Sequence, residues 1–291
     1  MTVSIVRPHT LRYLLVALAA ILAIGIGFAR PVLASHSPNL SATDRIKADP
    51  PPALFSDAQA STMGEHLAAQ ARPAADAMTS WWTAHGSTPD DAAFVSWLER
   101  QIPAPPTQGA RRNELRQVQR LAARRTPAGI AAATWLETNG KKDIWKLYQH
   151  DQRELLGKTA GKAEKQDLKV ILAMAKTASD SVAAVDRQSA PYVLDPTLRP
   201  EKIIKPGSVC PCSYPSRHAA RSAAARSYLG YLAPHRLPDY VSMEEQVTYS
   251  RIYMAGHVQS DLDAGTMLGD MIAEYILVTR GHRSVPSPTH R

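Results

Sequence analysis

Residues 250–261 read SRIYMAGHVQSD, a stretch that combines a serine–arginine pair with a histidine and an aspartate. On a helix, His257 and Asp261 are four residues apart and share a face, where the carboxylate can accept a hydrogen bond from the imidazole. Such a partner fixes the orientation and tautomer of the ring and leaves its other nitrogen free to attack. Arg251 adds a fork of donors that fits two phosphate oxygens. The stretch therefore predicts a helical site with a nucleophilic histidine.

The helix predicted next, at about 259–279, carries a broad apolar face. Its members are Ala264, Met267, Leu268, Met271, Ile272, Tyr275 and Ile276. Earlier helical patterns cover about 57–72, 74–84, 89–101, 109–125, 127–138, 142–156, 160–186, 216–232 and 241–256. Almost no alternating apolar pattern occurs, so the sequence predicts an all-α fold, a single helical domain in which the first helices pack around the last three.

A second polar cluster, Pro215-Ser216-Arg217-His218, precedes an alanine-rich run and marks the start of a helix near Ser216. The start of a helix offers unpaired N–H groups and the positive end of the helix dipole, both of which suit an anion. We expect Ser216 to donate its hydroxyl to that anion and His218 to protonate a leaving oxygen. Together, the two clusters predict in-line transfer of a phosphoryl group to His257.

These residues resemble the type 2 phosphatidic acid phosphatase superfamily, which includes secreted bacterial class A acid phosphatases, membrane lipid phosphatases and vanadium haloperoxidases. The resemblance covers about residues 165–280. The third family motif is matched by Ser250, Arg251, His257 and Asp261, and the second by Pro215, Ser216 and His218. Arg217 stands where the family has glycine, a residue that lets backbone approach an oxyanion closely. The resemblance implies a helical bundle of the phosphatase and haloperoxidase type.

The first family motif, a lysine followed after six residues by Arg-Pro, is not matched. An alignment on Pro191 places Ala190 at the arginine position. The alternative pair, Arg199-Pro200, has Tyr192 where the lysine belongs. The phosphate clamp is therefore reduced, or it is rebuilt from other cations, for which the candidates are Arg187, Arg217, Lys202, Lys205 and Lys176.

The resemblance also implies roles for individual residues. The implied catalytic set is His257, His218 and Asp261, and the implied phosphate-binding set is Arg251, Ser216, Arg217, Ser250 and Arg187. In this mechanism one histidine attacks phosphorus while the other protonates the departing alcohol and then acts as a base toward water. No metal or other cofactor is expected, because fixed cations take its place. The implied function is that of an acid phosphatase that hydrolyses small phosphomonoesters through a phosphohistidine intermediate.

The sequence leaves two other functions open. A vanadium-dependent haloperoxidase would use the same frame to hold vanadate as a cofactor, whereas a phosphatase would bind vanadate as an inhibitor. The absence of the first-motif lysine counts against this branch. A catalytically impaired protein that binds anions without turnover is the other reading, because Ala190 and Arg217 replace motif residues. The natural substrate and the oligomeric state are not fixed by the sequence.

The N-terminus has the order of a secretory signal peptide, with Arg7 and Arg12, an apolar run at 13–28 and Val32-Leu33-Ala34 before Ser35. The apolar run is about 16 residues, short of the roughly 20 that span a bilayer, and an uncleaved anchor is the alternative. We therefore expect a secreted or periplasmic protein without stable membrane insertion after cleavage. The predicted domains are a signal peptide at 1–34, an extended or disordered stretch at 35–56, the helical phosphatase domain at 57–280 and a disordered tail at 281–291.

The chain is basic, with a formal net charge of +8, which favours anionic substrates or surfaces. At helical spacing, Arg112, Arg116 and Arg120 form one charged stripe. Aromatic side chains for base stacking are missing there, so we expect a solvated face and no nucleic-acid partner. Cys210 and Cys212 lack further ligands at zinc spacing and predict a loop feature without a catalytic role, whether or not they are bridged.

Overall fold

The computed structural model describes residues 40–154, 158–202 and 211–286 of the chain. By its internal contacts the chain divides into two compact units, Met1–Pro50 and Pro51–Arg291. In the first unit the described helix is α2 (Ala42–Ala48), which Ser41 caps by accepting from the N–H of Asp44 at 3.1 Å. This helix lies within the stretch for which the sequence predicts extended or disordered chain. The predicted signal peptide lies outside the described residues.

The second unit is built from helices. Their bounds are α3 (Asp57–Ala60), η1 (Ser61–Met63), α4 (Gly64–Ala69), α5 (Ala71–His85), α6 (Asp91–Leu98), α7 (Gln108–Ala122), α8 (Pro127–Asn139), α9 (Asp143–Glu154), α10 (Lys158–Asp186), α11 (Pro191–Leu194), η2 (Pro196–Leu198), α12 (Arg217–Leu232), η3 (Pro234–Arg236), α13 (Leu237–Tyr253) and α14 (Gln259–Thr279). Within the described ranges, the β-type pairing is limited to an isolated bridge between Ser189 and Cys212. The predicted all-α fold is confirmed.

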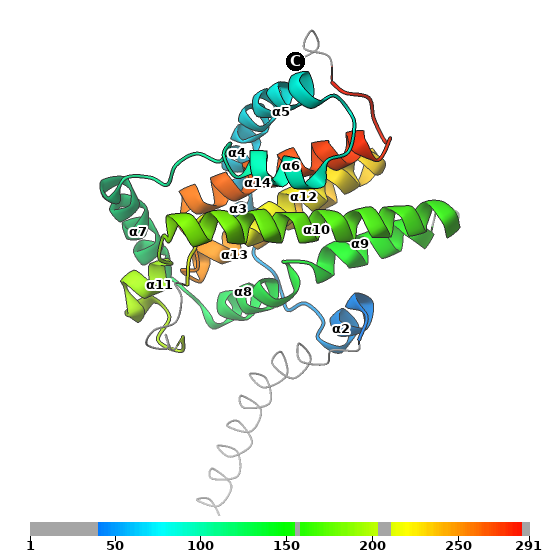
Figure 1. The fold of residues 1–291 in the computed structure, drawn as a ribbon. Coiled ribbons are helices and arrows are strands. Elements are labelled where there is room, and N and C mark those ends of the chain that lie inside the picture. The colour runs from blue at the N-terminus through cyan, green and yellow to red at the C-terminus, as the bar shows by residue number, and fades with distance from the viewer. Residues whose placement is uncertain (1–39, 155–157, 203–210, 287–291) are drawn as a thin grey trace, which may run out of the picture. The chain divides into compact units, whose positions relative to one another are not determined.

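Helix α12 is the central element of the second unit and packs against α10, α13 and α14 (Figure 1). Most of its residues are buried, although many of them are alanine or serine instead of large apolar residues. Short side chains allow neighbouring helices to approach closely, because the distance between packed helices depends on the side chains at the contact. The alanine-rich sequence therefore suits a helix that is surrounded on several sides.

The contact between α12 and α14 is tight at two glycines. A β-carbon added at Gly265 would collide with the carbonyl oxygen of Ser216, and one added at Gly269 would collide with the carbonyl oxygen of Ala220. Neither backbone oxygen can swing aside as the end of a flexible side chain can. The two helices thus meet backbone to backbone, and this contact holds the start of α12 against the first turns of α14.

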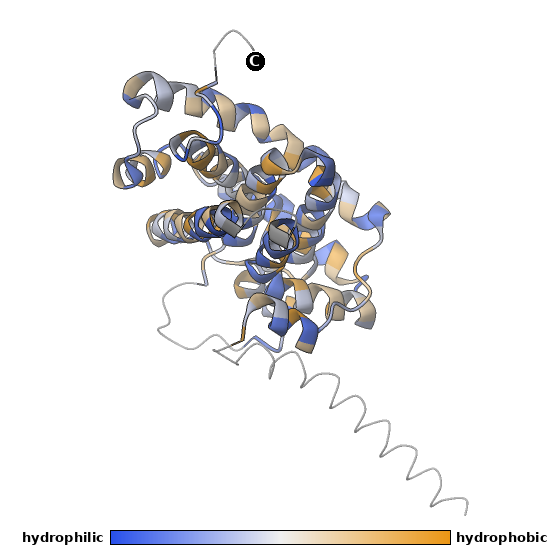
Figure 2. Cartoon of the chain, turned by 90° about the vertical axis from the view of Figure 1, so that its right-hand side faces the viewer, coloured by the Kyte–Doolittle hydropathy of each residue, from blue (hydrophilic) through white to orange (hydrophobic). Residues whose placement is uncertain are grey.

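Large side chains pack around this pair of helices. Phe94 of α6 stacks on Tyr275 of α14 with ring centroids 3.9 Å apart, and Trp81 of α5 contacts both rings. In Figure 2, helices seen nearly end-on carry both hydrophobic and hydrophilic colours, as expected for amphipathic helices around a core. Among the described helices, none has the length and apolar character needed to cross a membrane.

Two further segments differ from the sequence predictions. The single helix expected at 57–72 is divided into α3, η1 and α4. In the described part of the tail, which was predicted to be disordered, His282 Nε2 is 2.9 Å from Asp167 Oδ2. The carbonyl oxygen of His282 also accepts from the hydroxyl of Tyr231 at 3.1 Å. These contacts tie the chain just after α14 to α10 and α12.

Gly269→Ala should destabilise the protein, because the added methyl group meets the Ala220 carbonyl oxygen. Overpacking of this kind costs about 1–3 kcal/mol, which lowers the thermal midpoint of a domain of this size by about 2–4 °C per kcal/mol. The matched control is Gly109→Ala on α7, where an added β-carbon meets nothing nearer than 3.9 Å and alanine favours the helix. Calorimetry on both variants decides the matter: equal midpoints would contradict the close contact.

Candidate active site

The starts of α12 and α14 lie side by side, so the two polar clusters of the sequence meet. Ser216 caps α12 by accepting from the N–H of Ala219 at 3.3 Å, and its own N–H donates to the carbonyl oxygen of Asp261 at 2.7 Å. In the first turn of α14, Asp261 Oδ2 accepts from the N–H of Val258 at 3.0 Å. Asp261 therefore joins the two helix starts.

His257 lies in the link between α13 and α14, in the break that the sequence leaves between the predicted helices at 241–256 and 259–279. Helix α13 ends at Tyr253, and Ala255 has a φ of 53°, so the chain turns before α14 begins. The Nδ1 atom of His257 is 2.9 Å from the carbonyl oxygen of Ser213 and 3.6 Å from Asp261 Oδ2. Because a carbonyl oxygen only accepts, Nδ1 carries the proton and Nε2 holds the lone pair. Ser213 is thus the direct partner of the ring, and Asp261 is a second, longer contact.

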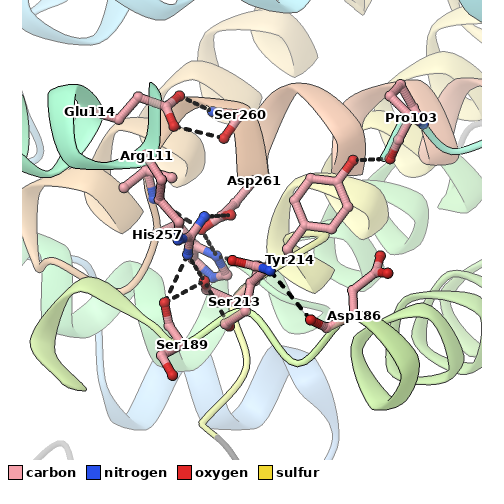
Figure 3. Close-up of polar contacts among 12 residues, drawn as sticks. Pro103, Arg111, Glu114, Asp186, Ser189, Ser213, Tyr214, His257, Ser260 and Asp261 are labelled. Atoms are coloured by element: carbon pink, nitrogen blue, oxygen red, sulfur yellow. Dashed lines mark hydrogen bonds and ion pairs between the residues drawn. The ribbon is translucent and has the colours of Figure 1, made fainter. Parts of the chain in front are cut away.

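Arg111 of α7 holds this arrangement together (Figure 3). Its Nη1 donates to Asp261 Oδ1 at 2.9 Å, and its Nη2 donates to Ser213 Oγ and to the carbonyl oxygen of Ser189 at 2.8 Å each. Both residues that His257 contacts, Ser213 and Asp261, are therefore bound through their side chains to one buried guanidinium. Burial would raise the pKa of Asp261, but His257 and Arg111 outweigh burial and lower it, so the carboxylate is ionised.

A second contact anchors α7 to α14. The Glu114 carboxylate accepts from the N–H of Ser260 at 2.8 Å and from its hydroxyl at 2.9 Å (Figure 3). Arg111 and Glu114 are three residues apart, so they lie on one face of α7, the face that contacts the start of α14. The basic stripe predicted to be solvated, which comprises Arg112, Arg116 and Arg120, is exposed.

His257 and His218 line one pocket of about 430 Å³, a volume within the range of about 300–1,000 Å³ common for small-molecule sites. Their ring centroids are 6.5 Å apart, too far for a direct hydrogen bond between the rings. Other lining residues include the cations Arg199, Lys202, Arg217 and Arg251, the carboxylates Glu137 and Asp180, and Ser179 and Tyr192. The pocket therefore combines two imidazoles with several charged groups.

Glu137, near the end of α8, gathers three of the cations. Its Oε2 is 3.1 Å from Arg199 Nη1 and 3.5 Å from Arg251 Nη1. Its Oε1 is 3.6 Å from Lys202 Nζ. Burial alone would raise the pKa of Glu137, but these cations together hold it well below its usual value. Glu201 also pairs with Arg199, with its Oε1 2.8 Å from Arg199 Nε, so three cations face two carboxylates and one positive charge is left over, which favours an anionic ligand.

The guanidinium of Arg251 is not saturated by these contacts. Its side chain is 5% exposed, and its Nε and Nη1 atoms make no hydrogen bond to any described residue. Buried donors are normally paired, and leaving one unpaired costs about 1–3 kcal/mol. Arg251 is also a lining residue of the pocket, so its guanidinium is a candidate ligand for an oxyanion there.

His218 lies in the first turn of α12 with one nitrogen bound to the protein. Its Nε2 is 3.1 Å from the carbonyl oxygen of Glu137, so in the neutral ring Nε2 carries the proton and Nδ1 does not. Burial and the charge of Arg251 lower the pKa of His218 well below its ordinary value. Burial also lowers the pKa of His257. Both rings are neutral near pH 7, which suits His257 as a nucleophile and requires His218 to gain a proton before it acts as an acid.

Two predicted phosphate ligands have other roles in the structure. Ser216 is fully buried as the cap of α12 and is not among the residues that line the pocket. The hydroxyl of Ser250 donates to the carbonyl oxygen of Val247 at 2.6 Å, within α13. The helix geometry explains both outcomes, because capping and bonding to the preceding turn are the usual uses of a serine hydroxyl.

Arg187, a candidate phosphate ligand from the sequence, is not among the residues that line the pocket of His257 and His218. Helix α10 ends just before it, its Nε donates to the carbonyl oxygen of Ala184 at 3.3 Å, and it lines a separate pocket beside Arg111. Lys176 pairs with Asp180 at 2.6 Å on the surface of α10. Of the other candidate cations, Arg217 and Lys202 line the pocket, whereas Lys205 lies outside the described residues. The Nη1 of Arg217 is 3.2 Å from Asp180 Oδ1.

Arg199 is the cation that sequence reasoning set aside. Tyr192 and Arg199 both line the pocket, and the guanidinium carbon is 5.8 Å from the centroid of the tyrosine ring. The pair has the spacing of the first family motif, with tyrosine in place of lysine. This spacing is the feature of the sequence that could have identified Arg199 as a pocket residue. Glu137 and Arg111 had no such signal, because they belong to helices outside the motif region.

Cys212 lines the pocket and takes part in a disulfide. Cys210, the other cysteine of the chain, lies outside the described residues. No group of three or more His, Cys, Asp or Glu side chains suited to a metal ion occurs in the described part of the chain. The pocket is lined by the cations Arg199, Lys202, Arg217 and Arg251, which are charged donors that suit an oxyanion.

Comparisons with protein-family models and with curated proteins give no significant match to this chain. The residues of the pocket are therefore the basis on which a function can be inferred.

Sulfate binding should be accompanied by proton uptake. Sulfate stays a dianion across the range in which histidine titrates, and an opposite charge nearby favours the protonated ring. Bound sulfate should therefore raise the pKa of His218 from its depressed value. At a pH between the pKa of His218 in the free protein and its pKa in the sulfate complex, the complex holds a proton that the free protein lacks. The affinity for sulfate should therefore rise as the pH falls. Calorimetry in buffers of different ionisation enthalpy should detect net proton uptake when sulfate binds in this pH range.

The control is His218→Gln, which keeps a polar side chain but cannot gain a proton. It should take up fewer protons than wild type on binding sulfate. If the wild-type protein binds sulfate with an affinity that is independent of pH and without proton exchange, His218 is not the group that gains a proton.

Proposed function

We propose that this protein is a phosphohydrolase that cleaves small phosphomonoesters through a phosphohistidine intermediate. The proposal rests on one observation: His257 and His218 share a pocket with Arg251, a buried guanidinium whose Nε makes no hydrogen bond to any described residue and whose Nη1 lies 3.5 Å from Glu137 Oε2. When no metal ion stabilises the leaving group, phosphoryl transfer needs three kinds of group from the protein: a nucleophile, a proton donor and fixed cations.

In the first step, Nε2 of His257 attacks phosphorus. The bond between phosphorus and the ester oxygen breaks, and its electron pair goes to that oxygen, which takes a proton from Nδ1 of protonated His218. Nδ1 is the donor because Nε2 of His218 is bound to the carbonyl oxygen of Glu137. The dianionic substrate promotes this protonation by raising the pKa of the ring.

In the second step, water attacks the phosphorus of the phosphohistidine. Neutral His218 accepts a proton from the water at Nδ1, the N–P bond breaks, and the electron pair returns to Nε2 of His257. Phosphate leaves and the free enzyme is restored. The same histidine thus serves as acid and then as base, which requires a pKa near the operating pH in the complex.

Charge on the transferring phosphoryl group is stabilised by cations that are already in place. Arg251, Arg199 and Lys202 surround the fixed carboxylate of Glu137, so they require little reorganisation when the substrate binds. Arg111 and Asp261 are positioning residues, since they hold the His257 ring and touch no substrate. The proposal includes export from the cytoplasm, which the signal-peptide order of residues 1–34 supports.

His257→Ala should abolish turnover of p-nitrophenyl phosphate while leaving the fold intact. The covalent route needs the imidazole nitrogen, so we expect a loss of about 10³-fold or more in kcat. Rapid acid-free quenching of the wild-type enzyme with ³²P-labelled substrate should also trap acid-labile label on the protein, and the variant should trap none. Near-UV circular dichroism checks the folding of the variant.

His235→Ala is the matched control, because this histidine is exposed on η3 and remote from the pocket. It should retain wild-type turnover. A folded His257→Ala variant with near wild-type activity would overturn the mechanism. Wild-type protein that oxidises halide in the presence of vanadate and peroxide, and hydrolyses no phosphomonoester, would instead support the haloperoxidase reading.

A further inference from the structure

Tyr192 of α11 is a lining residue of the pocket that has no part in the steps above. Its side chain is half-buried, and its hydroxyl makes no hydrogen bond to any described residue. Unlike the hydroxyl of Ser179, which is enclosed by the protein, the hydroxyl of Tyr192 is accessible to solvent. A phenol that is both accessible and without a protein partner can donate its hydrogen bond to a ligand.

The backbone of Tyr192 adjoins the link that carries the nucleophile. Its N–H donates to the carbonyl oxygen of Ala255 at 3.2 Å, two residues before His257. The guanidinium of Arg251 approaches the same link, because a β-carbon added at Gly256 would lie 2.6 Å from Arg251 Nη2. Tyr192 and Arg251 therefore both contact the chain just before His257.

The side chain of Tyr192 lies among the charged groups of the pocket. The guanidinium carbon of Arg199 is 5.8 Å from the centroid of its ring, within the distance of about 6 Å at which a cation interacts with an aromatic face. Burial raises the pKa of Tyr192, and Glu137 adds to this effect, whereas Arg199 and Arg251 oppose it. The phenol oxygen thus lies within the field of both guanidiniums. Its raised pKa keeps the hydroxyl protonated at neutral pH, so it remains a donor.

A phosphoryl group bound to Arg251 would bring its oxygens close to this hydroxyl. In the transition state the charge spreads over three equatorial oxygens, whereas the fork of one guanidinium contacts two. A tyrosine hydroxyl is one of the fixed donors that stabilise such charge in an enclosed site. Because it is neutral, it adds a hydrogen bond without adding to the repulsion among Arg199, Lys202 and Arg251.

We propose that Tyr192 is a further catalytic residue, whose hydroxyl donates a hydrogen bond to an equatorial oxygen of the transferring phosphoryl group. The inference rests on the proposed function and adds a neutral donor to the cations of that site. The hydroxyl keeps its proton in both steps, so His218 remains the acid and the base. Since the contact is made to the phosphoryl group, it serves every phosphomonoester alike, whatever its alcohol part.

The test compares Tyr192→Phe with wild type on two esters of unlike alcohols, p-nitrophenyl phosphate and glycerol 1-phosphate. The variant keeps the ring beside Arg199 and loses only the hydroxyl. Its kcat/KM should fall by about 10- to 100-fold on both substrates, the effect of one hydrogen bond to a charged group. Its inhibition constant for vanadate should rise, because vanadate presents oxygens in the positions of the phosphoryl oxygens. Its thermal midpoint should stay close to wild type.

The matched control is Tyr148→Phe. Tyr148 of α9 is also half-buried, and the guanidinium carbon of Arg236 is 5.5 Å from the centroid of its ring. It is not a lining residue of this pocket. The control variant should therefore keep wild-type kinetics on both substrates.

Each other outcome bears on the inference. Unchanged kinetics and unchanged vanadate inhibition in Tyr192→Phe would overturn it. A loss confined to one substrate would show that Tyr192 binds the alcohol part, and full activity in Tyr192→Phe with a loss in Tyr192→Leu would assign the effect to the ring; either result overturns the inference while leaving the phosphohydrolase in place. If the wild-type protein neither hydrolyses these esters nor binds vanadate, the proposed function itself fails, and the inference fails with it.

Discussion

The backbone contact between α12 and α14 is the constraint on which the rest of the site depends. Gly265 and Gly269 remove the side chains that would hold the helices apart. At this separation the N–H of Ser216 reaches the carbonyl oxygen of Asp261 at 2.7 Å, and the starts of both helices lie together. His218 and His257 then open into one pocket although they belong to separate stretches of sequence. Larger side chains at the two glycines would push the starts of the two helices apart and separate His218 from His257.

Buried charge is the second constraint, and the buried charged groups differ in how completely the protein pairs them. Asp261 is bound by Arg111 and by the N–H of Val258, so its charge is compensated inside the protein. Arg251 is also buried, but its Nε makes no hydrogen bond to any described residue and its Nη1 has only a 3.5 Å contact with Glu137 Oε2. Burial also lowers the pKa of both histidines and so favours their neutral form, which suits the proposed role of His257 as a nucleophile.

Much of the fold followed from local patterns in the sequence. The breaks at proline and glycine and the apolar faces predicted the long helices to within a few residues, because these signals act within a few turns. Helix α2 was not predicted, since a short helix depends on its Ser41 cap more than on periodicity. The histidines and Arg251 were found because they stand at fixed spacing in two short clusters.

The residues that sequence reasoning missed act across long separations. Arg111 and Glu137 contact the motif residues only once α7 and α8 pack against the other helices. Local sequence spacing cannot predict such long-range contacts. Arg187 was chosen in place of Arg199 because the lysine of the expected motif was absent, yet Arg199 lines the pocket. The direct partner of His257 is the backbone carbonyl of Ser213. Because every residue has a backbone carbonyl, the identity of the residue at position 213 does not predict this contact.

A crystal structure of the protein with vanadate tests the central claim most directly, because vanadate adopts the five-coordinate geometry of phosphoryl transfer. The account predicts vanadium bonded to Nε2 of His257, with its equatorial oxygens within hydrogen-bond distance of Arg251 and an apical oxygen near Nδ1 of His218. Vanadate bound elsewhere, for example against the exposed arginines of α7, with His257 uncoordinated at saturating concentration, would contradict the account.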